Sequence, residues 1–126
     1  MNKAVILPLY KAPHFAEQVT DWIWQAFGEG LPRAFFHSIV EHSQTPGALP
    51  LTFIAVDGEQ LLGTVGLWRC DLITRQDLCP WLAALYVDDA ARGKGLAGQL
   101  QQHVIAYAAQ SGYEELHLWS ACRDFY

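Results

Sequence analysis

The chain has 126 residues, of which 52% are hydrophobic and 17% are charged, and this composition suits one compact domain with a buried core. Its net charge is −5 and its eight Lys and Arg residues are spread along the sequence, so it lacks the basic cluster that nucleic-acid binding needs. The apolar stretch near the N-terminus is interrupted at Pro8 and is too short for a signal sequence or a transmembrane helix. Three Cys residues without a CxxC pair suggest neither a disulfide framework nor a zinc site. We therefore expect a cytoplasmic protein that binds no nucleic acid, membrane or metal.

The first half of the chain predicts a strand, two helices and a hairpin. Residues 4–10 are rich in Val, Ile and Leu, as strands are. Residues 15–27 place apolar side chains at helical spacing, and a second short helix is expected at residues 32–41. Two β-type runs, residues 51–56 and 60–69, flank Asp-Gly, which is a strong hairpin signal.

The second half predicts a strand, a helix and a further strand. Residues 81–87 (WLAALYV) form a continuous apolar run, as expected of a strand buried on both faces at the centre of a sheet. Residues 94–110 place apolar side chains on one helical face before Ser111-Gly112 ends the pattern. Residues 115–119 read as one more strand. This order predicts an α+β or mixed α/β layout around a single sheet.

Residues 85–100 (LYVDDAARGKGLAGQL) hold the strongest functional pattern. A buried strand ends there and a glycine-flanked basic turn opens a helix, whose first N–H groups lack intrahelical partners and attract phosphate. Gly93 and Gly95 leave room for a phosphate, Arg92 and Lys94 add positive charge, and Gly98 would let another backbone pack closely. The pattern predicts a phosphate-binding turn.

The glycines of this turn allow one other interpretation, and two further phosphate-binding patterns do not fit the chain. They could form only a tight turn with solvated cations, because GxG after a strand is a weak signal. The chain contains no GKS or GKT, which excludes the Walker pattern. The letters GKGLAG fit the dinucleotide fingerprint, but they lie late in the chain and behind an antiparallel run of strands, where that fingerprint does not occur.

Residues 87–97 (VDDAARGKGLA) resemble the signature of GNAT (general N-acetyltransferase) acetyltransferases, in which a central strand is followed by R/QxxGxG/A. Arg92, Gly95 and Ala97 occupy its three defining positions. The preceding LCPWLAALYV is similar to a variant of the family's fourth strand, and the order of elements matches over residues 1–126. The resemblance implies a mixed α/β, acyl-CoA N-acyltransferase-like fold whose sheet is flanked by helices and splayed between its fourth and fifth strands.

The resemblance also implies a cofactor site for acetyl-CoA, the acyl donor, without a metal. The pantetheine arm would pair with the backbone near Leu85 and Val87 in the splay. The amides of residues 93–98 would hold the pyrophosphate. The residues implied in cofactor binding are Leu85, Val87, Arg92, Gly93, Lys94, Gly95, Leu96, Ala97 and Gly98.

The implied reaction is direct transfer of acetyl to a primary amine of a small molecule, and less so to an amine of a protein. Phe125-Tyr126 matches the start of the family's FYxxxGF pattern, so Tyr126 is the candidate general acid for the departing thiolate. The alternative is that Tyr126 only packs against the sheet. No general base is named, because Asp71, Asp77 and Asp88 read as turn or capping groups.

The family pattern continues past FY, whereas this chain ends at Tyr126. We therefore expect a single domain, residues 1–126, that is C-terminally truncated, with a homodimer as a way to complete the sheet. A non-catalytic acyl-CoA-binding or interaction module is the main alternative function. A phosphate-binding protein of another kind, with a coincidental GKGLA turn, is a third.

Overall fold

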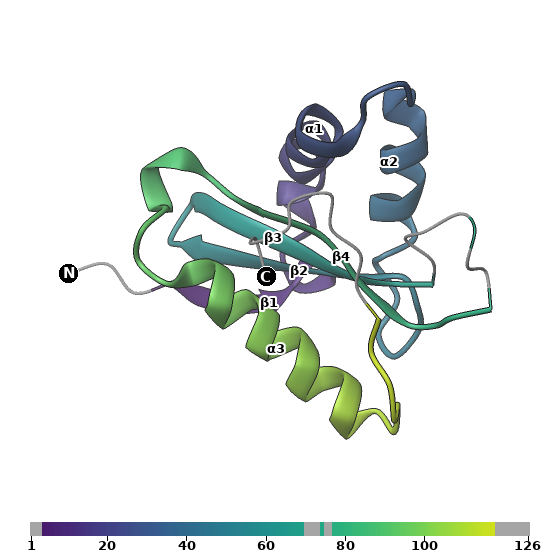
Figure 1. The fold of residues 1–126 in the computed structure, drawn as a ribbon. Coiled ribbons are helices and arrows are strands. Elements are labelled where there is room, and N and C mark those ends of the chain that lie inside the picture. The colour runs from purple at the N-terminus through teal and green to yellow at the C-terminus, as the bar shows by residue number, and fades with distance from the viewer. Residues whose placement is uncertain (1–3, 70–73, 75–76, 118–126) are drawn as a thin grey trace.

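The computed structural model describes residues 4–69, 74 and 77–117, and consists of a sheet with helices on both faces (Figure 1). In chain order the strands and helices are β1 (Val5–Pro8), α1 (Ala16–Phe27), α2 (Arg33–Glu41), β2 (Leu51–Asp57), β3 (Gln60–Trp68), β4 (Trp81–Val87) and α3 (Leu96–Gln110). Short 3-10 turns lie at Leu9–Lys11, Pro13–Phe15 and Asp89–Ala91. Within the described ranges, no helix is long and apolar enough to cross a bilayer.

The sheet has the order β1-β2-β3-β4, and all of its neighbouring strands are antiparallel. The predicted hairpin is confirmed, because Asp57 pairs with Gln60 and Gly58 has a φ of 62°, which only glycine adopts easily. Beyond β4, His117 forms a single parallel bridge to Trp81. The predicted strand at 115–119 is thus represented by one bridge, and its last two residues lie outside the described ranges.

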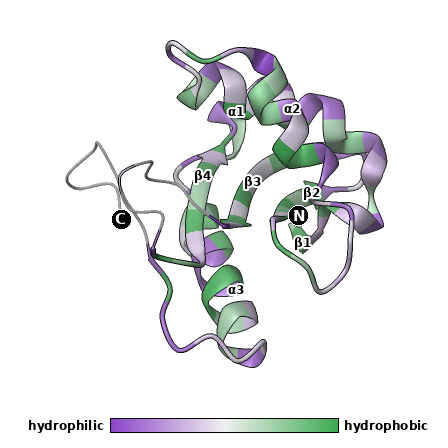
Figure 2. Ribbon diagram, turned by 90° about the vertical axis from the view of Figure 1, so that its right-hand side faces the viewer, coloured by the Kyte–Doolittle hydropathy of each residue, from purple (hydrophilic) through white to green (hydrophobic). Residues whose placement is uncertain are grey.

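Two apolar cores lie on opposite faces of the sheet, as expected for strands that alternate their side chains between faces. In Figure 1, α1 and α2 cover one face and α3 covers the other. The core under α3 includes Phe53, Leu85 and Leu100, and the core under α1 and α2 includes Ile23 and Ile54. Figure 2 shows that the strands between these layers are largely hydrophobic.

The prediction that β4 is buried on both faces is confirmed, since most of its residues are buried. The prediction that it is central needs correcting: among the described strands it lies at one edge of the sheet, with only the His117 bridge beyond it.

Two predicted boundaries differ from the structure by two residues. The first strand ends at Pro8 rather than at residue 10, because the chain turns there and places Leu9 fully inside the core. The last helix begins at Leu96 rather than at residue 94, because Gly95 is in the left-handed conformation, with φ 78°. A left-handed residue cannot belong to a right-handed helix, so Gly95 is the residue immediately before the helix.

Candidate functional site

A β-bulge in the middle of β4 shapes the strand that carries the first part of the site. The register of β3 against β4 shifts by one residue between Gly66 and Thr64. Two β4 residues, Ala84 and Leu85, therefore face one residue of β3. Ala84 has a φ of 53°, an uncommon conformation for a residue with a Cβ. Ala83 and Ala84 both lie on the α1 and α2 side, which breaks the usual alternation of side chains.

This bulge determines which backbone groups of β4 face away from β3. Before the bulge, the amide of Leu82 points outward and donates to the carbonyl of His117 at 2.8 Å. After the bulge, the amide of Asp88 points inward and donates to a carbonyl of β3 at 2.9 Å. The backbone groups of even-numbered residues therefore point away from β3 before the bulge and towards β3 after it. Beyond the bulge, the backbone groups that point outward are those of Leu85 and Val87. These are the two residues predicted to pair with pantetheine.

The N-terminus of α3 carries unsatisfied donors. No side chain caps the helix, and its first hydrogen bond within the described residues joins the amide of Gln99 to the carbonyl of Gly95 at 3.2 Å. The amides of Leu96, Ala97 and Gly98 are therefore without intrahelical partners. Together with the partial positive charge of the helix end, they form a site suited to an anion. The side chain of Leu96 is 5% exposed and belongs to the core, so only its backbone is available to a ligand.

The glycines around this helix end leave its surface open. Gly93 and Gly95 have φ values of 81° and 78°, and a Cβ on either would meet no atom within 4 Å. The same holds for Gly98. Among the described residues no backbone lies within 4 Å of that position, so the expectation that Gly98 admits a closely packed backbone stays a prediction. A phosphate could approach all three positions, which fits the predicted cofactor site.

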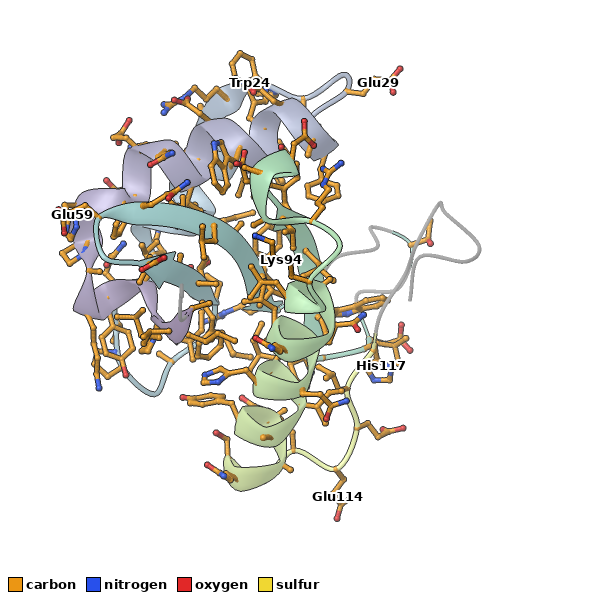
Figure 3. All side chains as sticks on the ribbon, turned by 90° about the vertical axis from the view of Figure 1, so that its left-hand side faces the viewer. Trp24, Glu29, Glu59, Lys94, Glu114 and His117 are labelled. Carbon is orange, nitrogen blue, oxygen red and sulfur yellow. The ribbon has the colours of Figure 1, made fainter. Side chains whose placement is uncertain are left out.

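Lys94 lies at the end of α3 that meets the loop from β4, as Figure 3 shows. Among the described residues it forms no hydrogen bond or ion pair, so its ammonium group is available to an anion. Arg92 differs, since its side chain forms a hydrogen bond and an ion pair within the protein. Its Nε donates to the carbonyl of Val87 at 2.8 Å, and its Nη1 lies 2.9 Å from Oδ1 of Asp89. Both cations thus adjoin the helix end, and only Lys94 is unpaired there.

An aromatic pair that the sequence did not predict adjoins the site on the other face of the sheet. The rings of Tyr86 on β4 and Trp22 on α1 meet edge to face, with 5.4 Å between their centroids. The guanidinium of Arg92 lies 5.5 Å from the centroid of the Tyr86 ring, within the range of a cation–π contact. The sequence gives no signal for this contact, because it depends on how α1 crosses the sheet.

Some predicted features lie outside the described residues. These are Tyr126, the candidate general acid, and the splay between the fourth and fifth strands beyond His117. Within the described part of the chain, no three His, Cys, Asp or Glu side chains gather where they could hold a metal ion. The described site is therefore a helix end with unpartnered amides, which suits an anion, beside the outward edge of β4.

The chain is similar to known proteins in both sequence and fold. The sequence matches the family described as "Acetyltransferase (GNAT) family" over residues 16–126. The chain belongs to the GNAT acetyltransferase family. The predicted resemblance and fold class are thereby confirmed, and with them the type of enzyme, an N-acetyltransferase, and its acyl donor, acetyl-CoA.

Solved structures with the same fold support this assignment. An aminoglycoside N-acetyltransferase AAC(6')-Iy in complex with CoA has a TM-score of 0.73 and 21% identity, over 96% of this chain and 79% of that one. A GNAT-family acetyltransferase from Staphylococcus aureus Mu50 has a TM-score of 0.71 and 18% identity, over 94% and 73%. A predicted acetyltransferase with acetyl-CoA from Clostridium acetobutylicum has a TM-score of 0.68 and 14% identity, over 95% and 81%. A search of curated proteins found no match. At such identities these structures establish the GNAT fold and not the acceptor.

Proposed function

We propose that this protein transfers the acetyl group of acetyl-CoA directly to a primary amine of a small molecule. The observation that carries the proposal is the junction of β4 and α3. There, one loop, residues 88–95, joins the outward backbone groups of Leu85 and Val87 to the unpartnered amides at the start of α3. An extended chain with amide groups could pair with the strand edge while its phosphates meet the helix end. Pantetheine joined to a pyrophosphate has both parts.

In this proposal the cofactor residues divide by the groups they offer. Leu85 and Val87 offer backbone groups to pantetheine. Residues 93–98 offer amides and open space to the pyrophosphate, and Lys94 offers charge. Through its hydrogen bond to Val87, Arg92 holds the loop that joins the edge of β4 to the start of α3. The residues present therefore fit acetyl-CoA.

The proposed reaction is a single displacement. The neutral amine attacks the thioester carbonyl, a C–N bond forms, the C–S bond breaks, and the amine loses a proton as the thiolate gains one. We propose Tyr126 as the group that protonates the thiolate. The small-molecule acceptor is supported by two similar structures of one aminoglycoside acetyltransferase, AAC(6')-Iy, of which one is in complex with the bisubstrate analog CoA-S-monomethyl-acetylneamine. A cytoplasmic location agrees with this class of substrate and is part of the proposal.

Calorimetric titration of the purified chain with acetyl-CoA, followed by thiol release against a panel of amines, tests the proposal. Binding with amine-dependent release of CoA is the expected result. Binding without release from any amine would favour a non-catalytic acyl-CoA-binding module. An absence of binding would contradict the assignment of residues 93–98 as the pyrophosphate site.

We also propose that the single domain of residues 1–126 forms a homodimer through a sheet edge. Among the described strands β1 is the outer strand opposite β4, and its Val5 is 57% exposed. Strand edges of this kind pair readily with other chains. Sedimentation equilibrium at micromolar concentration tests this proposal, and a mass of 14.1 kDa would contradict it.

A further inference from the structure

The strongest unassigned feature is the direction of the Arg92 side chain. An arginine beside a phosphate site is ordinarily expected to contact the phosphate. Here the Nε of Arg92 bonds to the Val87 carbonyl at 2.8 Å and the Nη1 pairs with Asp89 at 2.9 Å. The Cζ atom of the guanidinium lies over the ring of Tyr86, 5.5 Å from its centroid. The Nε atom, the Nη1 atom and the ring contact of Arg92 are therefore all directed at the protein.

These contacts close the loop that joins the two parts of the site. The loop begins at Val87 and ends at Arg92, and a 3-10 turn lies between them. Backbone bonds hold this turn, from the amide of Ala91 to Asp88 at 2.9 Å and from the amide of Arg92 to Asp89 at 3.3 Å. The side chain of Arg92 then returns to the first residue of the loop. The loop is thus fixed at both of its ends by one residue.

The carbonyl that Arg92 engages lies on the open edge of β4. Val87 turns its backbone groups outward, and with its carbonyl taken by Arg92 its amide remains for a ligand. Immediately after Arg92, Gly93 adopts φ 81° and leads into the unpartnered amides of α3. The position of those amides relative to the strand edge therefore depends on the Arg92–Val87 bond. A ligand that spans both binds more tightly when their separation is fixed in advance.

We infer that Arg92 is a positioning residue, which sets the spacing between the β4 edge and the amides of α3 through its bond to Val87, and does not act as a charge on the pyrophosphate. This inference rests on the proposed function, because it concerns how acetyl-CoA is held. It assigns the charge contact to Lys94, whose ammonium is unpaired among the described residues. It assigns to Arg92 the donation of one hydrogen bond from Nε, for which the charge of the guanidinium is not needed.

Two substitutions separate the positioning role from the charge role. In Arg92→Gln the amide nitrogen stands the same number of bonds from Cα as the Nε of arginine, so the donor is kept and the charge is lost. In Arg92→Lys the charge is kept, but no donor stands at that position. The positioning role predicts that R92Q binds acetyl-CoA within about threefold of the wild type, whereas R92K and R92A bind about tenfold more weakly, as expected for the loss of one hydrogen bond. Titration calorimetry measures all four proteins.

The reverse order, with R92K near the wild type and R92Q weak, would overturn the inference. Arg69→Lys is the matched control, because Arg69 also donates its Nε to a backbone carbonyl, that of Leu49 at 3.1 Å. It lies just past β3, away from the start of α3, and R69K should bind as the wild type does. Thermal unfolding of each variant checks that the fold is intact.

A ligand-free measurement keeps the inference distinct from the proposed function. A wild type that fails to bind acetyl-CoA contradicts the proposed function before any variant is made. In that same free protein, the Arg92 Nε–H should exchange slowly with solvent in proton–nitrogen NMR spectra, because it is hydrogen-bonded to Val87. Exchange as fast as that of free arginine would overturn the positioning role by itself.

Discussion

The indole of Trp68 lies across the position that a side chain at Gly66 would occupy. A Cβ at Gly66 would meet the Nε1, Cε2 and Cδ1 atoms of Trp68, which is two residues further along β3 on the same face. Trp68 is 5% exposed, and among the described residues its Nε1 is buried without a hydrogen-bond partner. Gly66 is therefore required by packing and not by its backbone conformation.

We predict that Gly66→Ala destabilises the protein by about 1–3 kcal/mol, because the added methyl group must displace a buried indole. Urea unfolding monitored by Trp fluorescence measures the change in the free energy of unfolding. Gly98→Ala is a useful control: its Cβ would meet open space within α3, so it should be about 0.5–1 kcal/mol more stable than the wild type. Equal stability of Gly66→Ala and the wild type would show that the indole moves freely.

Local signals in the sequence predicted most of the fold. The Asp57-Gly58 turn and the glycines at residues 93 and 95 have backbone conformations that their residue types favour, so the hairpin could be read from the chain and the helix start to within two residues. The bulge could not be, because Ala84 has no preference for a positive φ. The orientation of Arg92 could not be predicted either, because residue spacing does not indicate that its side chain bonds to the carbonyl of Val87 at the end of β4. A motif therefore locates a site better than it assigns the role of each side chain.

We predict that His103 makes the stability of the protein depend on pH. Its ring packs edge to face against Phe53, with 5.0 Å between centroids, and burial lowers the pKa of His103 below its ordinary value. The unfolded chain consequently takes up a proton at a higher pH than the folded protein does. The free energy of unfolding should therefore fall as the pH drops through the unfolded pKa of about 6.5, and level off below the folded pKa.

Urea unfolding of the wild type and His103→Gln at pH 7.5, 6.5 and 5.5 measures this effect. The wild type should lose more stability between pH 7.5 and 5.5 than the variant does, because glutamine does not titrate. Other groups titrate equally in both proteins and cancel in the comparison. Parallel losses in the two proteins would mean that His103 is protonated as easily in the fold as in the unfolded chain.

Replacement of Tyr126 tests the proposed general acid. Tyr126→Phe removes only the hydroxyl group, so the Kd for acetyl-CoA should be unchanged while kcat falls about a hundredfold or more, the usual contribution of a general acid. Tyr113→Phe, at a residue that is 39% exposed and lies just beyond the C-terminal end of α3, is the matched control and should leave kcat unchanged. A Tyr126→Phe enzyme that turns over at the wild-type rate would assign thiolate protonation to another group or to water.

Gly95 gives the sharpest test of the cofactor site. Gly95→Glu would place a carboxylate in the open space before α3, where the pyrophosphate is proposed to bind, and like charges repel strongly there. The substitution also strains the backbone by roughly 1 kcal/mol, because Gly95 has a positive φ. Gly112→Glu carries the same strain, with φ 91° and equally open space, but stands beyond the other end of a 15-residue helix, roughly 22 Å away at 1.5 Å per residue. We predict that titration calorimetry detects no acetyl-CoA binding to Gly95→Glu and wild-type binding to Gly112→Glu. Because both variants share the backbone strain and the added charge, equal affinities in the two proteins would refute the pyrophosphate site at the start of α3.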